Sequence, residues 1–185
     1  MRASTPSPRV PASEDAPING VARRARARVG LQVDMQKHVR AWTPRRGDIA
    51  AWASAALGRR ATRGELSIRL VGRAEGRKLN AQYRGKDYAT NVLSFPAAAV
   101  PPAGASAGGV TAQPLGDLVI CPPVLRAEAL EQRKTLRAHW AHLVVHGALH
   151  LIGYDHELDA DARRMERREI AVLRRLGFTN PYLGT

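Results

Sequence analysis

The sequence predicts an α+β domain in which helices surround a small β-sheet. Short segments with the period-two pattern of strands are mixed with longer segments of helical periodicity. One predicted helix also carries histidines at metal-ligand spacing. With 185 residues, 44% of them hydrophobic, the chain has the length of one domain and enough apolar side chains for a core. Strands mixed with helices in this way are typical of a small α+β layer fold.

Strands and helices alternate through the first half of the chain. Residues 29–35 alternate apolar and polar side chains and predict the first strand. Apolar residues then recur at helical spacing over residues 47–57, which predicts the first helix. The same two patterns return as a strand at 66–70 and a helix at 75–83. Residues 91–95 are a short apolar run, typical of a buried strand, and the proline after them ends it.

The second half begins with a stretch that has no clear pattern. Residues 97–114 are rich in Ala, Gly and Pro and predict a flexible loop. A continuous apolar run at 116–121 predicts the last strand, which two prolines end. Three helices follow, over residues 123–133, 135–152 and 159–176. Thr135 is the expected N-cap of the middle helix, because its hydroxyl can accept from a free backbone N–H.

The chain is strongly basic. It has 29 Lys and Arg against 16 Asp and Glu, a net charge of +13. Residues 1–30 contribute +4 of this, from six arginines and two acidic residues, which leaves +9 for the rest. Since 25 of the 29 cations are arginines, whose planar guanidinium suits phosphate, the charge favours a polyanionic partner such as nucleic acid. A coding bias toward arginine is the alternative explanation.

Composition also sets the domain limits and excludes some classes of protein. Residues 1–27 are rich in Pro, Ala, Ser and Arg, which predicts a disordered basic tail before a domain at 28–185. A transit peptide fits the tail less well because of its prolines and paired acids. No apolar run reaches 18 residues and no secretory signal is present, so a membrane protein is not expected. Cys121 is the only cysteine, which suits core packing in a reducing cytoplasm.

The segment His146-Gly-Ala-Leu-His150-Leu-Ile-Gly-Tyr-Asp-His156 predicts a metal site. His146 and His150 are four residues apart, so on a helix they share one face. Gly153 permits a left-handed turn that brings His156 back toward the same ion. Three nitrogen ligands leave one position open on a tetrahedral zinc, as in catalytic sites. For His139 and His142, by contrast, ordinary packing on the helix is the expected state.

The spacing equals that of the zinc-protease motif H-E-x-x-H-x-x-G-x-x-H, with one departure. Gly147 stands where a protease has its general-base glutamate. A glycine cannot accept a proton from water, so peptidase activity is not expected.

Charged residues also gather just before the third predicted strand. Arg84, Lys86 and Asp87 lie in a loop at the mouth of that strand, where loops on a rigid scaffold often carry chemistry. A solvated turn, with Asp87 paired to Lys86 or Arg84, explains them equally well from spacing alone.

Three segments resemble, in this order, the YbeY family of bacterial endoribonucleases, which are linked to ribosomal RNA maturation. They are Arg84-Gly-Lys-Asp with Thr90-Asn-Val-Leu-Ser-Phe-Pro96, Leu115-Gly-Asp-Leu-Val-Ile-Cys121, and His146 to His156. The resemblance covers roughly residues 29–177, and the tail and the 97–114 loop depart from the family pattern.

The resemblance implies a single zincin-like domain with a small mixed sheet and a metal site on a helix that a glycine turn follows. It implies His146, His150 and His156 as ligands of one Zn²⁺ per chain, and Arg84 as the functional arginine of the cleft. Arg77 and Lys86 are expected to contact RNA. The expected partners are ribosomal RNA and the small ribosomal subunit, with ribosome-assembly proteins as a further candidate class.

The function expected from the resemblance is zinc-dependent, single-strand-specific endoribonuclease activity in ribosomal RNA processing and small-subunit maturation, in the cytoplasm. Zinc would assist attack on an RNA phosphate that Arg84 holds. Attack by water and attack by a 2′-hydroxyl both stay open. The first rival is a zinc-stabilised ribosome-assembly or RNA-binding factor without catalysis of its own. A metalloprotease is the second, and Gly147 disfavours it.

Overall fold

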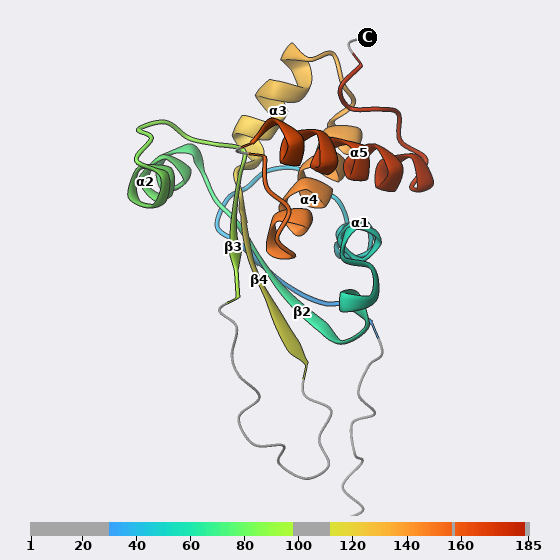
Figure 1. Ribbon diagram of the computed structural model, residues 1–185. Helices are drawn as coiled ribbons and strands as arrows, with labels where there is room; N and C mark the ends of the chain where they lie inside the picture. Colours follow the sequence, from blue (N-terminus) through green and yellow to red (C-terminus); the bar gives the residue numbers. More distant parts are fainter. Residues whose placement is uncertain (1–29, 98–111, 157, 184–185) are drawn as a thin grey trace, which may run out of the picture.

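A four-stranded mixed sheet lies at the centre of the computed structural model, which describes residues 30–97, 112–156 and 158–183 (Figure 1). The strands are β1 (Gln32–Lys37), β2 (Gly64–Leu70), β3 (Val92–Pro96) and β4 (Gln113–Ile120). Their order across the sheet is β1-β2-β4-β3. β1, β2 and β4 run parallel, and β3 pairs antiparallel with β4 as an edge strand.

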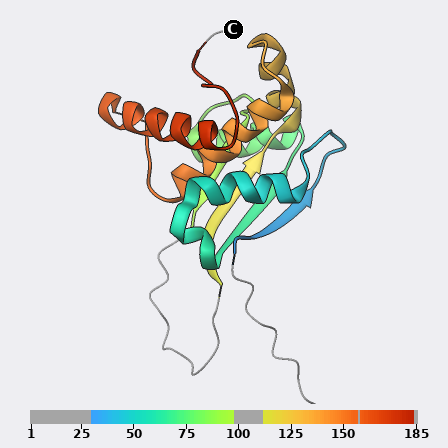
Figure 2. The same cartoon turned by 90° about the vertical axis from the view of Figure 1, so that its right-hand side faces the viewer.

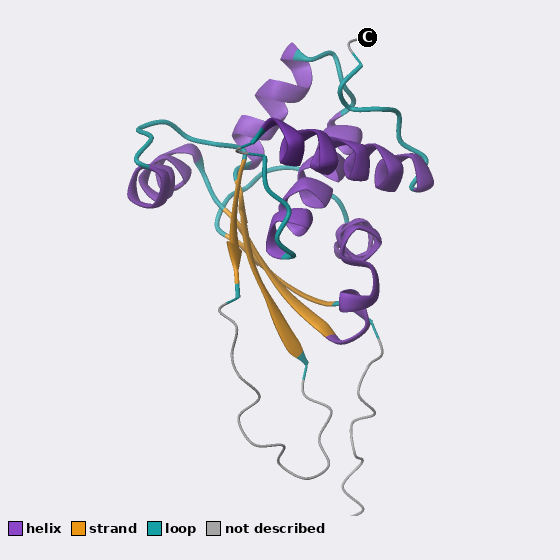
Figure 3. Cartoon of the chain, in the orientation of Figure 1, coloured by secondary structure: helices purple, strands orange, loops and turns teal. Residues whose placement is uncertain are grey.

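Helices cover the sheet, so the predicted α+β fold with a small mixed sheet is confirmed (Figure 3). The helices are α1 (Arg46–Leu57), α2 (Arg73–Arg84), α3 (Pro122–Glu131), α4 (Leu136–Leu151) and α5 (Asp159–Arg175). Thr135 caps α4 as predicted, because its Oγ1 accepts from Ala138 N at 3.2 Å. Within the part of the chain that the structure describes, no helix is long and apolar enough to cross a membrane.

Three elements differ from the prediction. β1 spans Gln32–Lys37 instead of residues 29–35. A 3₁₀ helix over Gly58–Arg63, which no apolar periodicity marks, joins α1 to β2. β4 begins at Gln113, although residues 113 and 114 were expected in the loop, because pairing with β2 extends the strand beyond its apolar run. The remainder of that loop, residues 98–111, and the predicted tail at 1–27 lie outside the described residues.

The two faces of the sheet are covered by different helices. α1 runs along one face beside α4 (Figure 2), where Leu118 and Ile120 of β4 join the main core with the buried Trp140 of α4. α2 lies on the opposite face, where Val119 and Leu93 belong to a second, smaller cluster that Leu79 of α2 borders. α5 in turn packs on the outer side of α4.

Gly147 lets α4 approach the sheet closely. A Cβ atom at this position would lie 2.8 Å from Leu118 Cδ2 and 3.2 Å from Ser94 Oγ. A side chain at this position would have to displace Leu118, because the face of α4 that it occupies is turned to the sheet. A glutamate at position 147 would therefore begin on the face of α4 that is turned to the sheet.

Replacing Gly147 with Glu should destabilise the fold instead of supplying a base. Overpacking costs about 1–3 kcal/mol, and an unpaired carboxylate in an apolar contact adds to it. We expect the free energy of unfolding, measured by urea denaturation, to fall by at least about 3 kcal/mol. The control is Gly47→Glu in the first turn of α1, where a Cβ meets nothing within 4 Å and an acidic side chain suits the helix N-terminus. Equal denaturation midpoints for both variants would contradict the expectation.

Candidate metal centre

The end of α4 turns the chain as the glycine in the sequence predicts. Gly153 has φ +90°, a backbone conformation that L side chains rarely adopt. Gly153 N donates to His150 O at 3.0 Å and Tyr154 N donates to Leu149 O at 3.1 Å. This pair of bonds is the Schellman pattern of helix ends, and it satisfies carbonyls that the last turn leaves free. The reversal directs the segment that carries His156 back along the helix.

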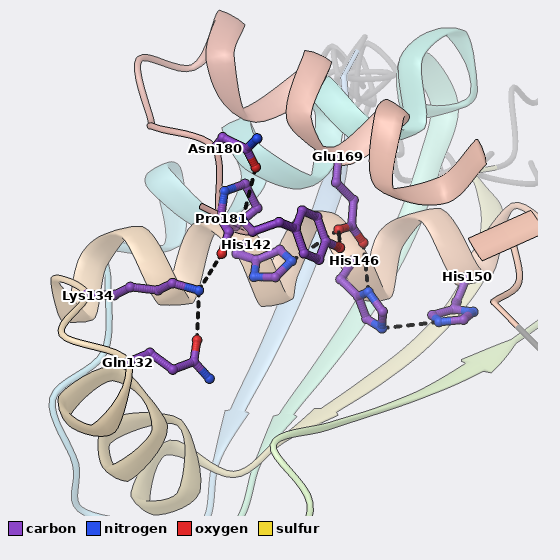
Figure 4. Close-up of polar contacts among 9 residues, drawn as sticks. Gln132, Lys134, His142, His146, His150, Glu169, Asn180 and Pro181 are labelled. Carbon is purple, nitrogen blue, oxygen red and sulfur yellow. Dashed lines mark hydrogen bonds and ion pairs between the residues drawn. The ribbon is translucent and has the colours of Figure 1, made fainter. Parts of the chain in front are cut away.

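The rings of His146, His150 and His156 consequently converge. The ring centroids of His146 and His150 are 4.7 Å apart, and those of His150 and His156 are 4.9 Å apart. One ligand atom from each of the three residues lies within 4.8 Å of the other two. The Nε2 atoms of His146 and His150 are 3.2 Å apart (Figure 4). Two nitrogens bound tetrahedrally to one zinc ion are about 3.3 Å apart, so this pair has the spacing that such an ion needs.

A fourth residue, Glu169 of α5, belongs to the centre and was not predicted from the sequence. Its side chain is fully buried, and its two carboxylate oxygens contact His146 and His142. His146 Nδ1 lies 2.7 Å from Oε1, and His142 Nε2 lies 3.1 Å from Oε2. The hydroxyl of Tyr182 also donates to Oε2. The sequence does hold a signal for this residue, because Glu169 is a charged residue on the apolar stripe of α5, between Met165 and Leu173.

The buried carboxylate determines which nitrogen of His146 is available. An ionised carboxylate can only accept hydrogen bonds, so both histidine nitrogens that face Glu169 carry hydrogens. His146 in this tautomer has the proton on Nδ1 and a free lone pair on Nε2, the atom that faces His150. Histidines that bind metals commonly donate their other N–H to a carboxylate in this way. The donor set therefore fits a divalent ion such as zinc.

Electrostatics support the same protonation states. Burial raises the pKa of Glu169, but the hydrogen bonds from His142 and His146 outweigh it and lower the pKa to about 2. For His150, burial and then the neighbouring His146 and His156 lower the pKa to about 4. At neutral pH the carboxylate is thus ionised and the His150 ring is neutral, which is the form that coordinates metals.

The other two histidines of α4 are packed, as expected. His139 is buried, and its Nε2 donates to Glu128 Oε2 at 2.9 Å. His142 is hydrogen-bonded to Glu169 and does not belong to the candidate metal-binding group that includes His150 and His156. His142, His146 and Glu169 do form a second group whose ligand atoms lie close enough for one ion.

A cavity opens beside the three histidines. It has a volume of about 320 Å³ and lies between the end of α4, the first turns of α5 and the C-terminal segment. Its walls include His146, His156, Glu166 and Tyr182. His156 is exposed, so the candidate centre can be reached from solvent.

Arg84, by contrast, lies away from α4, at the last residue of α2 on the opposite face of the sheet. Its side chain is exposed and, among the described residues, takes part in no ion pair. Its neighbour Tyr83 packs edge-on against Phe95 of β3, with ring centroids 4.9 Å apart. Both rings line a groove of about 430 Å³ on this face of the sheet.

Asp87, in the loop after α2, does not pair with either neighbour that the alternative explanation offered. Asp87 accepts two bonds from Arg77, at 2.7 and 2.6 Å, and neither Arg84 nor Lys86 pairs with it. Arg77 lies in α2, ten residues before Asp87, so this contact depends on how the loop folds back toward the helix. Lys86 is exposed, and Arg77 is already held by Asp87.

Fold and site together define an α+β protein with a candidate three-histidine metal centre. A family model described as Endoribonuclease YbeY matches residues 34–177. Endoribonuclease YbeY of Pseudomonas putida strain W619 is 51% identical over 152 residues, covering 82% of this chain and 93% of the relative. The same protein of Stutzerimonas stutzeri strain A1501 is also 51% identical, over 82% of this chain and 91% of its own length. The chain belongs to the YbeY family, which confirms the resemblance of its three motifs.

A solved structure is also similar to the chain. The solution structure of a protein from Thermotoga maritima matches 83% of this chain and 99% of its own, with a TM-score of 0.47 and 20% identity.

Proposed function

We propose that this protein is a zinc-dependent endoribonuclease that cleaves single-stranded RNA during ribosomal RNA processing and small-subunit maturation in the cytoplasm. The observation that carries the proposal is the 3.2 Å approach of the His146 and His150 Nε2 atoms beside His156, in a chain of the YbeY family. RNA is the proposed partner because the family name specifies it and because the net charge of +13 attracts polyanions.

His146, His150 and His156 would hold the ion. A divalent ion held by three neutral imidazoles supplies Lewis-acid catalysis, since it lowers the pKa of water toward about 7 and polarises phosphoryl oxygens. Glu169 keeps His146 in the coordinating tautomer, and the cavity lined by Glu166 and Tyr182 offers space for part of the RNA. No side chain at position 147 is required for these roles.

Arg84 would contact a phosphate of the same RNA. Its guanidinium is exposed and unpaired among the described residues, so it is free to bind an anion. β3 is one of the two edge strands, with Ser94 near α4 and Phe95 against α2. An RNA strand that crosses this edge can reach the histidines on one side and Arg84 on the other. Arg77 and Lys86, on the same side as Arg84, would add charge to the contact.

The proposal is tested by incubating the zinc-loaded protein with an end-labelled RNA that has single-stranded and base-paired segments. We expect cuts in the single-stranded segment, none after the metal is stripped with a chelator, and recovery when zinc is returned. The chemistry of the new ends identifies the attacking group, because a 2′,3′-cyclic phosphate requires the 2′-hydroxyl.

Circular dichroism of the stripped protein separates an enzyme from a binding module. A chain that stays folded without zinc but no longer cuts RNA supports a catalytic ion. A chain that unfolds without zinc, and that never cuts RNA when loaded, contradicts the proposal and favours an RNA-binding factor whose zinc is structural.

A further inference from the structure

We propose that Glu169 is a positioning residue of the three-histidine centre, and that Tyr182 of the C-terminal segment holds it in place. In this arrangement the carboxylate orients His146 for the ion without binding the ion itself. The inference rests on the proposed metal-dependent function and deepens it by assigning two residues that lie outside the ligand motif.

The first argument is that three donors already occupy the carboxylate. His146 Nδ1 donates to Oε1 at 2.7 Å, and His142 Nε2 and the Tyr182 hydroxyl both donate to Oε2. Glu169 is fully buried, so an ion bound by it together with His142 and His146 would have to replace hydrogen bonds that are already made, at a cost in free energy. This disfavours the second group of possible ligands, which consists of His142, His146 and Glu169.

The second argument is the direction of the His146 ring. With Nδ1 bonded to Glu169, Nε2 points to His150, and the ring stacks on His156 at a centroid distance of 5.6 Å. Figure 4 shows Glu169 above the His142–His146 side of α4, and His150 on the far side of His146. The carboxylate and the candidate ion position are therefore at opposite ends of one imidazole, which is the arrangement that fixes a ligand ring and raises its basicity.

The third argument is that Tyr182 is itself anchored. Lys134 Nζ, at the start of α4, donates to Pro181 O at 2.5 Å and to Gln132 Oε1 at 2.7 Å. Tyr182 N donates to Asn180 Oδ1 at 3.0 Å. The ring of Tyr182 packs edge-on against His142 at 5.5 Å and lines the cavity beside the histidines. The C-terminal segment thus holds the hydroxyl against the carboxylate, beside His142 of α4.

The same helix provides a matched control. Glu128 of α3 receives a bond from His139 of α4, as Glu169 does from His146, but His139 is not among the candidate ligands. Glu128→Gln removes a carboxylate that accepts a hydrogen bond from a histidine, and it leaves the three-histidine centre unchanged. A second control, Glu166→Gln, removes a carboxylate from the wall of the cavity that has no bond to a histidine among the described residues.

The test measures zinc affinity by competition with a chromophoric chelator, for the full chain and its variants. Loss of an outer partner of a metal ligand typically costs about 10–100-fold in metal affinity. We expect Glu169→Gln to weaken zinc binding by about 10-fold or more and to change the visible absorption of the cobalt(II)-substituted protein. Glu128→Gln and Glu166→Gln should keep the parent affinity. Circular dichroism checks that each variant is folded.

Tyr182→Phe keeps the aromatic ring and removes only the hydroxyl, so it provides a milder variant if Glu169→Gln does not fold. It should weaken zinc binding less than Glu169→Gln, because the carboxylate keeps both histidine bonds. Unchanged zinc affinity in Tyr182→Phe overturns the role given to Tyr182.

Two further results would contradict the role given to Glu169. Unchanged affinity and an unchanged cobalt spectrum in a folded Glu169→Gln variant would show that it does not position the centre. Loss of zinc in both His142→Gln and Glu169→Gln, with zinc retained in His150→Ala, would place the ion in the second group. If the parent protein binds no divalent metal at all, the proposed metal-dependent function fails instead, which is a distinct outcome.

Discussion

Replacing His150 with alanine should remove the metal from the protein. His150 Nε2 faces His146 Nε2 at 3.2 Å, so the substitution leaves only His146 and the exposed His156 to hold an ion. Losing a direct ligand should cost more than losing an outer partner, so we expect zinc affinity to fall by more than about 100-fold. Elemental analysis after dialysis measures the metal bound per chain, which should fall from about one ion to a trace.

His142→Ala is the control for this experiment. His142 lies on the same helix and is also bonded to Glu169, but it is not grouped with His150 and His156. At saturating zinc it should keep the metal content of the parent. Undiminished metal in a folded His150→Ala variant would mean that the three-histidine group is not the metal site.

Replacing Arg84 with alanine should reduce RNA cleavage far more than RNA binding or metal content. Arg84 and the histidines lie on opposite faces of the sheet, so Arg84 can act on the reacting phosphate only when bound RNA and the loop after α2 bring the two together. A guanidinium placed there acts mainly in the transition state, and the loss of one such donor typically costs about 10²–10³ in rate. Loss of one exposed cation from a broadly basic surface costs little affinity. Single-turnover cleavage rates, compared with RNA affinities from filter binding, separate the two effects.

Two further variants on α2 serve as controls for this experiment. Arg84→Lys should recover only part of the rate, because a point charge cannot make the bidentate contact of a guanidinium. Arg77→Ala removes a cation that Asp87 already pairs, so it should leave the rate of cleavage of bound RNA near that of the parent. Equal losses of binding and rate in Arg84→Ala would mark Arg84 as an ordinary RNA contact. Unchanged cleavage in Arg84→Ala would show that Arg84 does not belong to the active centre.

The features that local sequence determines could be predicted. The spacing of His146 and His150 and the turn at Gly153 involve neighbours along one helix, and the structure has them as the pattern indicates. Cys121 is buried and Thr135 caps α4 for the same reason, because a short apolar run and a hydroxyl before a helix act locally.

Features that depend on distant contacts could not be predicted. Glu169 meets His146 across 23 positions of the chain, and no motif links the two. The order of the strands depends on pairing between β2 and β4, which are separated by α2 and β3. Spacing suggested Lys86 or Arg84 as a possible partner of Asp87, whereas Asp87 is bound by Arg77, ten residues before it in the chain. The position of Arg84 relative to the histidines likewise depends on which face of the sheet α2 covers.

The close packing of α4 against the sheet at Gly147 also affects how an ion binds. Because Leu118 and Ser94 lie against the backbone at this point, the residues on either side cannot shift toward or away from the sheet without disturbing the core. His146 is next to this contact, so the His146–His150 pair is preorganised before any ion arrives. The conformational entropy of ordering that pair is lost when the chain folds and does not weaken binding. His156 is exposed and lies beyond the end of α4, so its side chain has more conformational entropy to lose when an ion binds than the other two ligands have.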